Sequence, residues 1–261
     1  VNAGNSIASG GNYNVVVGDE AGTALTTGDA NVAVGYQALA TEDAHGLNTA
    51  VGYQALKTLD AGADGNNTAV GYIAGVFLTS GTRHTLMGSL AGDALTDADR
   101  NTAIGFAALS TDTLGSRSTA VGSGALFTQN FTTATDAYNT AVGFEAGLSV
   151  TTGTQNTLIG GLAGDALTTS GDNTAVGYLA LSAQVDGASQ NTAIGFKAGT
   201  ANLSGHSLTA VGREAAGANT TGTENTALGS LALQYNTVGN KSVAIGRLAL
   251  QDQNYGTSTD A

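Results

Sequence analysis

The chain has 261 residues, of which 39 are glycine, and it contains no proline, cysteine or tryptophan. Only 11% of the residues are charged, and 20 acidic against 8 basic residues give a formal net charge of -12. This acidity argues against binding to nucleic-acid phosphates and to anionic lipid, and no apolar run approaches the roughly 18 residues of a membrane span. We therefore expect no nucleic-acid partner and no membrane insertion. The absence of cysteine excludes disulfides, and the absence of proline excludes collagen.

Residues 1–13 precede the first repeat and are predicted to be an N-terminal lead-in. They contain no basic stretch followed by an apolar run, so no signal peptide is predicted. Because the chain starts with Val1, we expect it to be a fragment or a processed product. A single repeat domain is predicted over residues 14–250, and residues 251–261 are predicted to be a C-terminal tail.

The motif Asn-Thr-Ala-(Val/Ile)-Gly-(Tyr/Phe)-x-Ala-(Leu/Gly) recurs throughout the repeat domain. Ten of the thirteen intervals between its central glycines are 17 residues, and the others are 19, 21 and 18. At about 3.3 Å per extended residue, such a unit traces one flattened coil with two or three short strands. The sequence therefore predicts an all-β fold, a parallel β-solenoid (β-roll) of about fourteen coils of about 17 residues. The central glycines are Gly18, Gly35, Gly52, Gly71, Gly88, Gly105, Gly122, Gly143, Gly160, Gly177, Gly195, Gly212, Gly229 and Gly246.

Residues 48–53 illustrate the strand predicted in each coil. Alternation places Thr49, Val51 and Tyr53 on one face, and the Asn, Ala and Gly of the motif on the other. A second glycine usually follows ten or eleven residues after the first and is typical of a turn. Stacking in register would place the first motif residue, Asn in ten of fourteen coils, in a column joined by side-chain amide hydrogen bonds. The exceptions in this column are His84, Ser118, Leu208 and Ser242.

The longest coil follows Gly122 and contains the aromatic segment 127–138. Insertions in repeat proteins form loops on one face, and aromatic rings among amides and hydroxyls suit carbohydrate binding. Phe127, Phe131 and Tyr138 are therefore candidate ligand-binding residues. The alternative, which we favour, is that Phe127 and Phe131 cover a hydrophobic coil edge.

Catalysis requires groups that converge, and a regular ladder of repeats seldom supplies them. The three histidines, His45, His84 and His206, fall in separate coils. We therefore predict that the chain is not an enzyme and has no catalytic residues.

Acidic pairs in the loops offer the hard oxygen ligands that Ca²⁺ prefers. Isolated acids usually only keep a surface soluble, and the Gly-Gly-x-Gly-x-Asp calcium repeat is absent from the sequence. No cofactor or metal is therefore predicted, with Ca²⁺ at a chain interface as the alternative. The pairs are Glu42 and Asp43, Asp60 and Asp64, and Asp97 and Asp99.

One chain offers few large apolar side chains with which to offset the conformational entropy of its ordered residues. Two opposite strand faces cannot both point into a narrow coil. We therefore expect one of the two faces to pack against a neighbouring chain.

Two segments resemble known repeats. Residues 241–246 (Lys-Ser-Val-Ala-Ile-Gly) resemble the Asn-Ser-Val-Ala-Ile-Gly motif in the heads of trimeric autotransporter adhesins, and residues 48–56 (Asn-Thr-Ala-Val-Gly-Tyr-Gln-Ala-Leu) resemble repeats in bacteriophage tail fibres. The adhesin heads are left-handed parallel β-rolls, three chains side by side, that bind host surfaces. In the fibres such repeats often precede a self-cleaving chaperone domain. The resemblance implies a side-by-side homotrimer.

These features predict a structural fibre segment of a phage tail fibre or similar appendage, which supports attachment to a host cell surface. Its expected partners are two further copies of the chain, other fibre or virion proteins, and a host cell-surface glycan or protein. Its expected location is extracellular, on a virion or on a bacterial cell surface. The alternative is a bacterial adhesin whose coils bind host or matrix directly. A third possibility, an ice-binding solenoid, is disfavoured because Val and Tyr share the face of the recurrent Thr.

Overall fold

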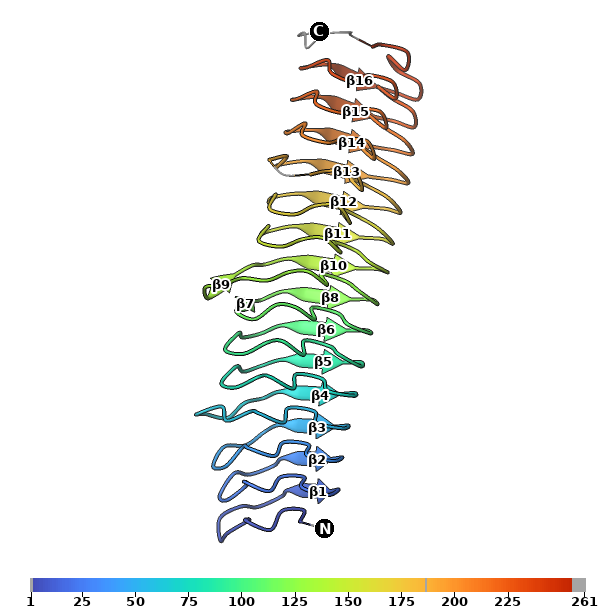
Figure 1. The fold of residues 1–261 in the computed structure, drawn as a ribbon. Coiled ribbons are helices and arrows are strands. Elements are labelled where there is room, and N and C mark those ends of the chain that lie inside the picture. The colour runs from blue at the N-terminus through green and yellow to red at the C-terminus, as the bar shows by residue number, and fades with distance from the viewer. Residues whose placement is uncertain (1, 186, 255–261) are drawn as a thin grey trace. The chain divides into compact units, whose positions relative to one another are not determined.

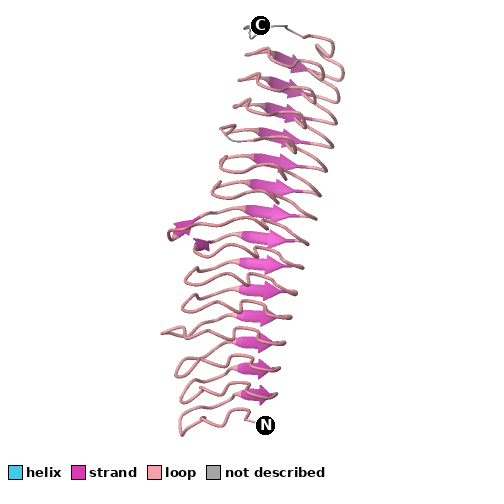
Figure 2. Cartoon of the chain, in the orientation of Figure 1, coloured by secondary structure: helices cyan, strands magenta, loops and turns pink. Residues whose placement is uncertain are grey.

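The computed structural model describes residues 2–185 and 187–254, so Val1 of the predicted lead-in and residues 255–261 of the predicted tail lie outside the described residues. The regular secondary structure of the described residues is entirely β, without helix (Figure 2). The chain divides into two compact units, Val1–Ala137 and Tyr138–Ala261. Seven coils of a parallel β-solenoid make up each unit. The predicted fold class is therefore confirmed, whereas a single domain over residues 14–250 stays a prediction.

In the first unit, each coil contributes one three-residue strand to a parallel sheet (Figure 1). The strands pair in strict register, with Thr49 opposite Thr68 and Val51 opposite Val70. A small second sheet pairs β7 with β9 in parallel, beside the main sheet. The main strands are β1 (Val15–Val17), β2 (Val32–Val34), β3 (Thr49–Val51), β4 (Thr68–Val70), β5 (Thr85–Met87), β6 (Thr102–Ile104) and β8 (Thr119–Val121), and the small sheet contains β7 (Gly115–Ser116) and β9 (Thr135–Asp136).

The second unit repeats this arrangement with the same register, for example Ala175 opposite Ala193. Its strands pair in chain order, each parallel to the next. They are β10 (Thr140–Val142), β11 (Thr157–Ile159), β12 (Thr174–Val176), β13 (Thr192–Ile194), β14 (Thr209–Val211), β15 (Thr226–Leu228) and β16 (Val243–Ile245).

The expectation of two or three strands per coil is wrong for most coils, because each places one strand in the main sheet and, among the described residues, only β7 and β9 are additional strands. Residues with positive φ bend the chain at three recurring places outside that strand, as at Leu47 (64°), Gln54 (56°) and Leu56 (48°). Backbone hydrogen bonds still join successive coils in these bends: Gln54 N donates to Tyr36 O at 2.8 Å. Hydrogen bonds therefore join successive coils around much of their circumference, although only one three-residue segment of each coil is extended and forms a strand of the main sheet.

The small residues of the motif fill the interior. Ala50 and Ala55 are completely buried, as are their equivalents in most coils, and Leu56 and Leu59 fill the remaining width of their coil. A large residue in the alanine column is matched by glycine nearby: Leu86 packs where a Cβ on Gly92 would lie 2.9 Å from its Cδ2. Such pairing is expected in a narrow core, where added volume has to be removed elsewhere.

The predicted asparagine column is present and buried, but its hydrogen bonds differ from the prediction. Asn31 Oδ1 accepts from the backbone N of Asn48 at 3.0 Å, and Asn31 Nδ2 donates to His45 O at 3.0 Å. Most hydrogen bonds among the described residues of this column join a side chain to the backbone, and a direct amide–amide bond occurs between Asn173 Nδ2 and Asn156 Oδ1 at 3.2 Å. Each asparagine thus satisfies backbone groups of the next coil, which would otherwise be buried without partners.

His84 performs the same role in place of asparagine. Its Nδ1 accepts from Asn101 N at 3.2 Å and its Nε2 donates to Ala98 O at 2.6 Å. This pattern requires the neutral imidazole, because a protonated Nδ1 cannot accept a hydrogen bond. Burial lowers the pKa of His84 and favours that neutral form.

Candidate functional site

The exposed side of the main sheet is the most extensive candidate surface in each unit. We call it the outer strand face. It consists of the residues three before, one before and one after each central glycine, such as Thr49, Val51 and Tyr53. Tyr53 is 43% exposed, whereas Ala50, which lies between Thr49 and Val51 in the strand, is fully buried. The alternation predicted for residues 48–53 is therefore observed, with the Asn and Ala side inward.

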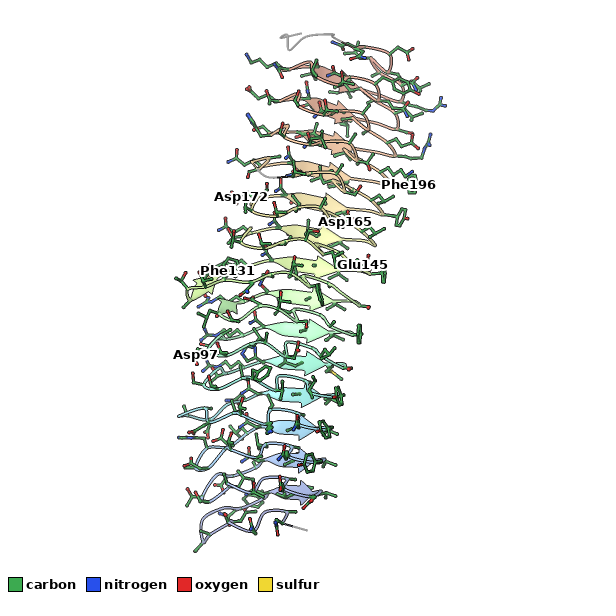
Figure 3. All side chains as sticks on the ribbon, viewed as in Figure 1. Asp97, Phe131, Glu145, Asp165, Asp172 and Phe196 are labelled. Carbon is green, nitrogen blue, oxygen red and sulfur yellow. The ribbon has the colours of Figure 1, made fainter. Side chains whose placement is uncertain are left out.

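Aromatic rings stack along this face. In the first unit the ring centroids of Tyr36 and Tyr53, and of Tyr53 and Tyr72, are each 5.3 Å apart. In the second unit Tyr178 stacks on Phe196 at 5.9 Å, and Phe196 projects beyond the carboxyl end of its strand in Figure 3. Their spacing follows from the strand register, since each ring occupies the same position in successive coils.

The outer strand face carries few charges, in contrast to the chain as a whole. Its first two rows are made of Thr, Val, Ile, Leu and Met alone, and the charged residues of the third row are Asp19, Arg213 and Arg247. Large apolar side chains remain open to solvent, among them Met87 in the first unit and Ile194 in the second. An exposed apolar row of this kind, which lies beside a row made mainly of Thr, often marks an interaction site on a soluble protein.

The three predicted ligand-binding residues differ in exposure. Phe131 is only 5% exposed, whereas Phe127 and Tyr138 are 36% and 48% exposed. Phe127 and Phe131 belong to the first unit, and Tyr138 is the first residue of the second. The burial of Phe131 agrees with the edge-covering alternative, and ligand binding by these residues stays a prediction.

Beneath Phe131 lies a buried polar group that sequence reasoning missed. Asp112 Oδ1 accepts from Gly115 N at 3.0 Å and from Phe131 N at 3.3 Å, and its Oδ2 accepts from Gln129 Nε2 at 2.5 Å. Burial raises the pKa of the Asp112 carboxyl. The group therefore anchors the long coil from inside, and the signal that could have found it is its place seven residues after Gly105, where Leu95 stands in the preceding coil.

The candidate calcium ligands fall into two kinds. Asp97 Oδ1 accepts from Thr79 Oγ1 at 2.8 Å, and Asp99 Oδ1 accepts from Thr82 N at 2.8 Å, so both carboxylates join successive coils. Asp64 likewise accepts from Gly46 N at 3.1 Å. By contrast Glu42, Asp43 and Asp60 gather around His45 in the first unit.

The remaining histidines are apart from this group. His84 is buried in the asparagine column, and His206 is exposed in the second unit. The prediction that the three histidines share no site agrees with these positions, whereas the absence of enzymatic activity stays a prediction.

The second unit has a shallow hollow of about 280 Å³. Its lining includes Gly217 and Ala218, together with Lys197, Glu214 and Tyr235. Glu214 Oε2 accepts from Gln234 Nε2 at 2.8 Å. The lining offers an aromatic ring, a cation, a carboxylate and an amide around one space.

Comparison with known protein families, with curated proteins and with solved structures finds no match to this chain. Across residues 2–185 and 187–254, no helix is long and apolar enough to cross a membrane.

Proposed function

We propose that this chain is a structural segment of an extracellular fibre, such as a phage tail fibre, that supports attachment to a host cell surface. In this proposal three copies lie side by side as a homotrimer and bury the outer strand face. The observation that carries the proposal is this face, because two uncharged rows, one mainly of Thr and one of Val, Ile, Leu and Met, recur in every coil. The number three and the attachment to a host rest on the resemblance of residues 48–56 and 241–246 to fibre and adhesin repeats.

The charge distribution supports association between identical chains. Copies that each carry a net charge of -12 repel one another. Contact is therefore least costly through a surface that carries few acidic groups, and the first two rows of the outer strand face carry none. The inner face is already satisfied within one chain, since Ala50 and Asn48 are buried there.

The mass of the native particle, measured by light scattering, tests the proposal. We expect a mass near three times 25.6 kDa. Ile104→Asp places a carboxylate in the middle row of the outer strand face, where burial of an unpaired charge in an interface costs several kcal/mol, on the order of 3 or more. This variant should dissociate.

Thr132→Asp is the matched control, because it adds the same charge to an exposed loop of the same unit. It should leave the mass unchanged. A monomeric native chain, or equal dissociation of both variants, would contradict the proposal.

The hollow beside Tyr235 favours a second function, in which the coils themselves bind a host ligand as in an adhesin. Tyrosine rings stack on sugars, and Lys197 and Glu214 supply donors and acceptors for hydroxyl groups. Saturable binding of a glycan by this segment alone would favour the adhesin over a purely structural fibre.

A further inference from the structure

Four side chains of types that bind metal ions converge in the first unit, between the coils of β2 and β3. Glu42, Asp43 and His45 follow β2, and Asp60 follows β3. One ligand atom from each lies within 4.8 Å of those of the other three. Ligands about 2.0–2.2 Å from one tetrahedral metal lie roughly 3.3–3.6 Å apart, so small side-chain movements would bring these atoms onto a common ion.

Glu42 is unusual because it is a carboxylate in a position that leucine occupies in the adjacent coils. Leu25, Glu42 and Leu59 each lie seven residues after a central glycine, and all three are completely buried. Glu42 Oε1 accepts from His45 N at 3.3 Å and Oε2 from Ala61 N at 3.2 Å. Burial raises the pKa of the Glu42 carboxyl, whereas the backbone hydrogen bonds from Ala61 and His45 and the His45 ring lower it.

Within the part of the chain that the structure describes, no lysine or arginine forms an ion pair with these three carboxylates. The group that faces Glu42 is the His45 ring, whose Nδ1 lies 3.4 Å from Oε1. Nδ1 is buried and has no hydrogen-bond partner. The His45 side chain is 29% exposed, so a cation can reach it from solution, and a neutral imidazole nitrogen is the commonest metal ligand among side chains.

Asp60 lies eight residues after Gly52, as Asp43 does after Gly35, so the register of the coils places the two in one column. The interval from Gly52 to Gly71 is 19 residues, and the two extra residues lie between Leu59 and Asn67. Asp60 begins this longer segment, and its side chain and that of Asp43 are exposed. The cluster is thus open to solution on one side and closed by Glu42 on the other.

We propose that Glu42, Asp43, His45 and Asp60 bind a divalent transition-metal cation, with Zn²⁺ the best match. One imidazole and three carboxylates offer four ligands, the number that structural zinc sites use. Ca²⁺ takes six to eight oxygen ligands and avoids imidazole, so it fits this set poorly. The bound ion would join two successive coils, because Asp60 belongs to the coil after that of the other three ligands.

Zn²⁺ binding to the full chain, free of any affinity tag and stripped with a chelator, tests this proposal by calorimetry. We expect one Zn²⁺ per chain and an increase in the melting temperature that chelator reverses. His45→Asn and Asp60→Asn remove ligands while leaving the backbone bonds of Glu42 in place. Each should weaken Zn²⁺ at least about tenfold, the lower limit found even for residues that only orient a ligand.

His206→Asn is the control, because it removes an exposed histidine from the other unit. It should leave Zn²⁺ affinity unchanged. The proposal is overturned if Zn²⁺ does not bind saturably, if all three variants weaken it equally, or if Ca²⁺ binds more tightly than Zn²⁺. In the first case His45 and Glu42 form only an ion pair. Because all four ligands come from one chain, the result is independent of whether the chain forms a trimer.

Discussion

The glycine at the centre of each motif faces the glycine of the next coil. Replacing Gly229 and Gly246 by alanine, one at a time, separates the cost of positive φ from the cost of a clash with the next coil. Gly229 and Gly246 have φ of 132° and 117°, which disfavour any side chain. A Cβ on Gly229 would lie 2.6 Å from both C and O of Gly246. A Cβ on Gly246 would meet nothing within 4 Å. Gly229→Ala therefore adds backbone strain and a steric clash, and Gly246→Ala adds strain alone.

The strain of such a φ costs about 1–3 kcal/mol in both variants. The clash in Gly229→Ala is with backbone atoms, so relief requires the last two coils to move apart. That movement weakens the bonds of Gly246 N to Leu228 O (2.8 Å) and Leu248 N to Ser230 O (3.0 Å). Overpacking of this kind adds about 1–3 kcal/mol. We therefore expect Gly229→Ala to cost about 2–6 kcal/mol and Gly246→Ala about 1–3 kcal/mol.

Amide hydrogen exchange of this 261-residue chain under native conditions measures the difference, because the coils of a repeat protein can open separately from one another. The reporter is Leu233 N, which donates to Ala249 O of the last coil at 3.0 Å. Gly229→Ala should lower its opening free energy more than Gly246→Ala does. Equal effects would refute the idea that close approach between coils, rather than φ alone, requires glycine.

Two further predictions concern the interior. Because burial lowers the pKa of His84, the unfolded chain takes up the proton first, and stability should fall as the pH drops through about 6.5. In His84→Asn the amide can make both hydrogen bonds of the imidazole and does not titrate. The difference in urea midpoint between the original chain and this variant should therefore grow on acidification. A difference that stays constant with pH would contradict this. Leu86→Ala should cost about 2–5 kcal/mol, and Gly92→Leu should be better tolerated in that background than alone, as a double-mutant cycle would measure. Additive costs would show that these two residues do not share the same space.

The regular part of the fold could be predicted from the sequence, because a constant spacing forces equivalent residues into columns. The alternation of Thr49, Ala50 and Val51 also predicted two faces, but not which one is internal. Volume decides this, since a coil of 17 residues has room for Ala50 and Asn48 but not for a row of tyrosines. The bend at Leu47 could not be predicted, because this residue adopts positive φ without a glycine in its column, whereas Gly75 and Gly92 at the position of Leu56 do indicate the bend there.

The metal-ligand cluster could be predicted only in part. Glu42, Asp43 and Asp60 were recognisable as candidate ligands, but sequence spacing paired Asp60 with Asp64. In the structure, Asp64 Oδ1 instead accepts a hydrogen bond from Gly46 N, and the Asp60 carboxylate lies near that of Glu42. His45 joins them across a turn whose shape depends on positive φ at Leu47, and spacing alone does not fix that geometry.

Two buried carboxylates share a structural role that the regular coils do not need. Glu42 and Asp112 each precede one of the two longest coils, of 19 and 21 residues. Each accepts from the backbone N three residues later and from the N of a residue nineteen later, Ala61 or Phe131. An insertion frees backbone groups from the ladder, and a carboxylate in the leucine column can accept from them where leucine cannot. Asp112 performs this role without a histidine among its partners, so anchoring the insertion does not explain why His45 lies against Glu42.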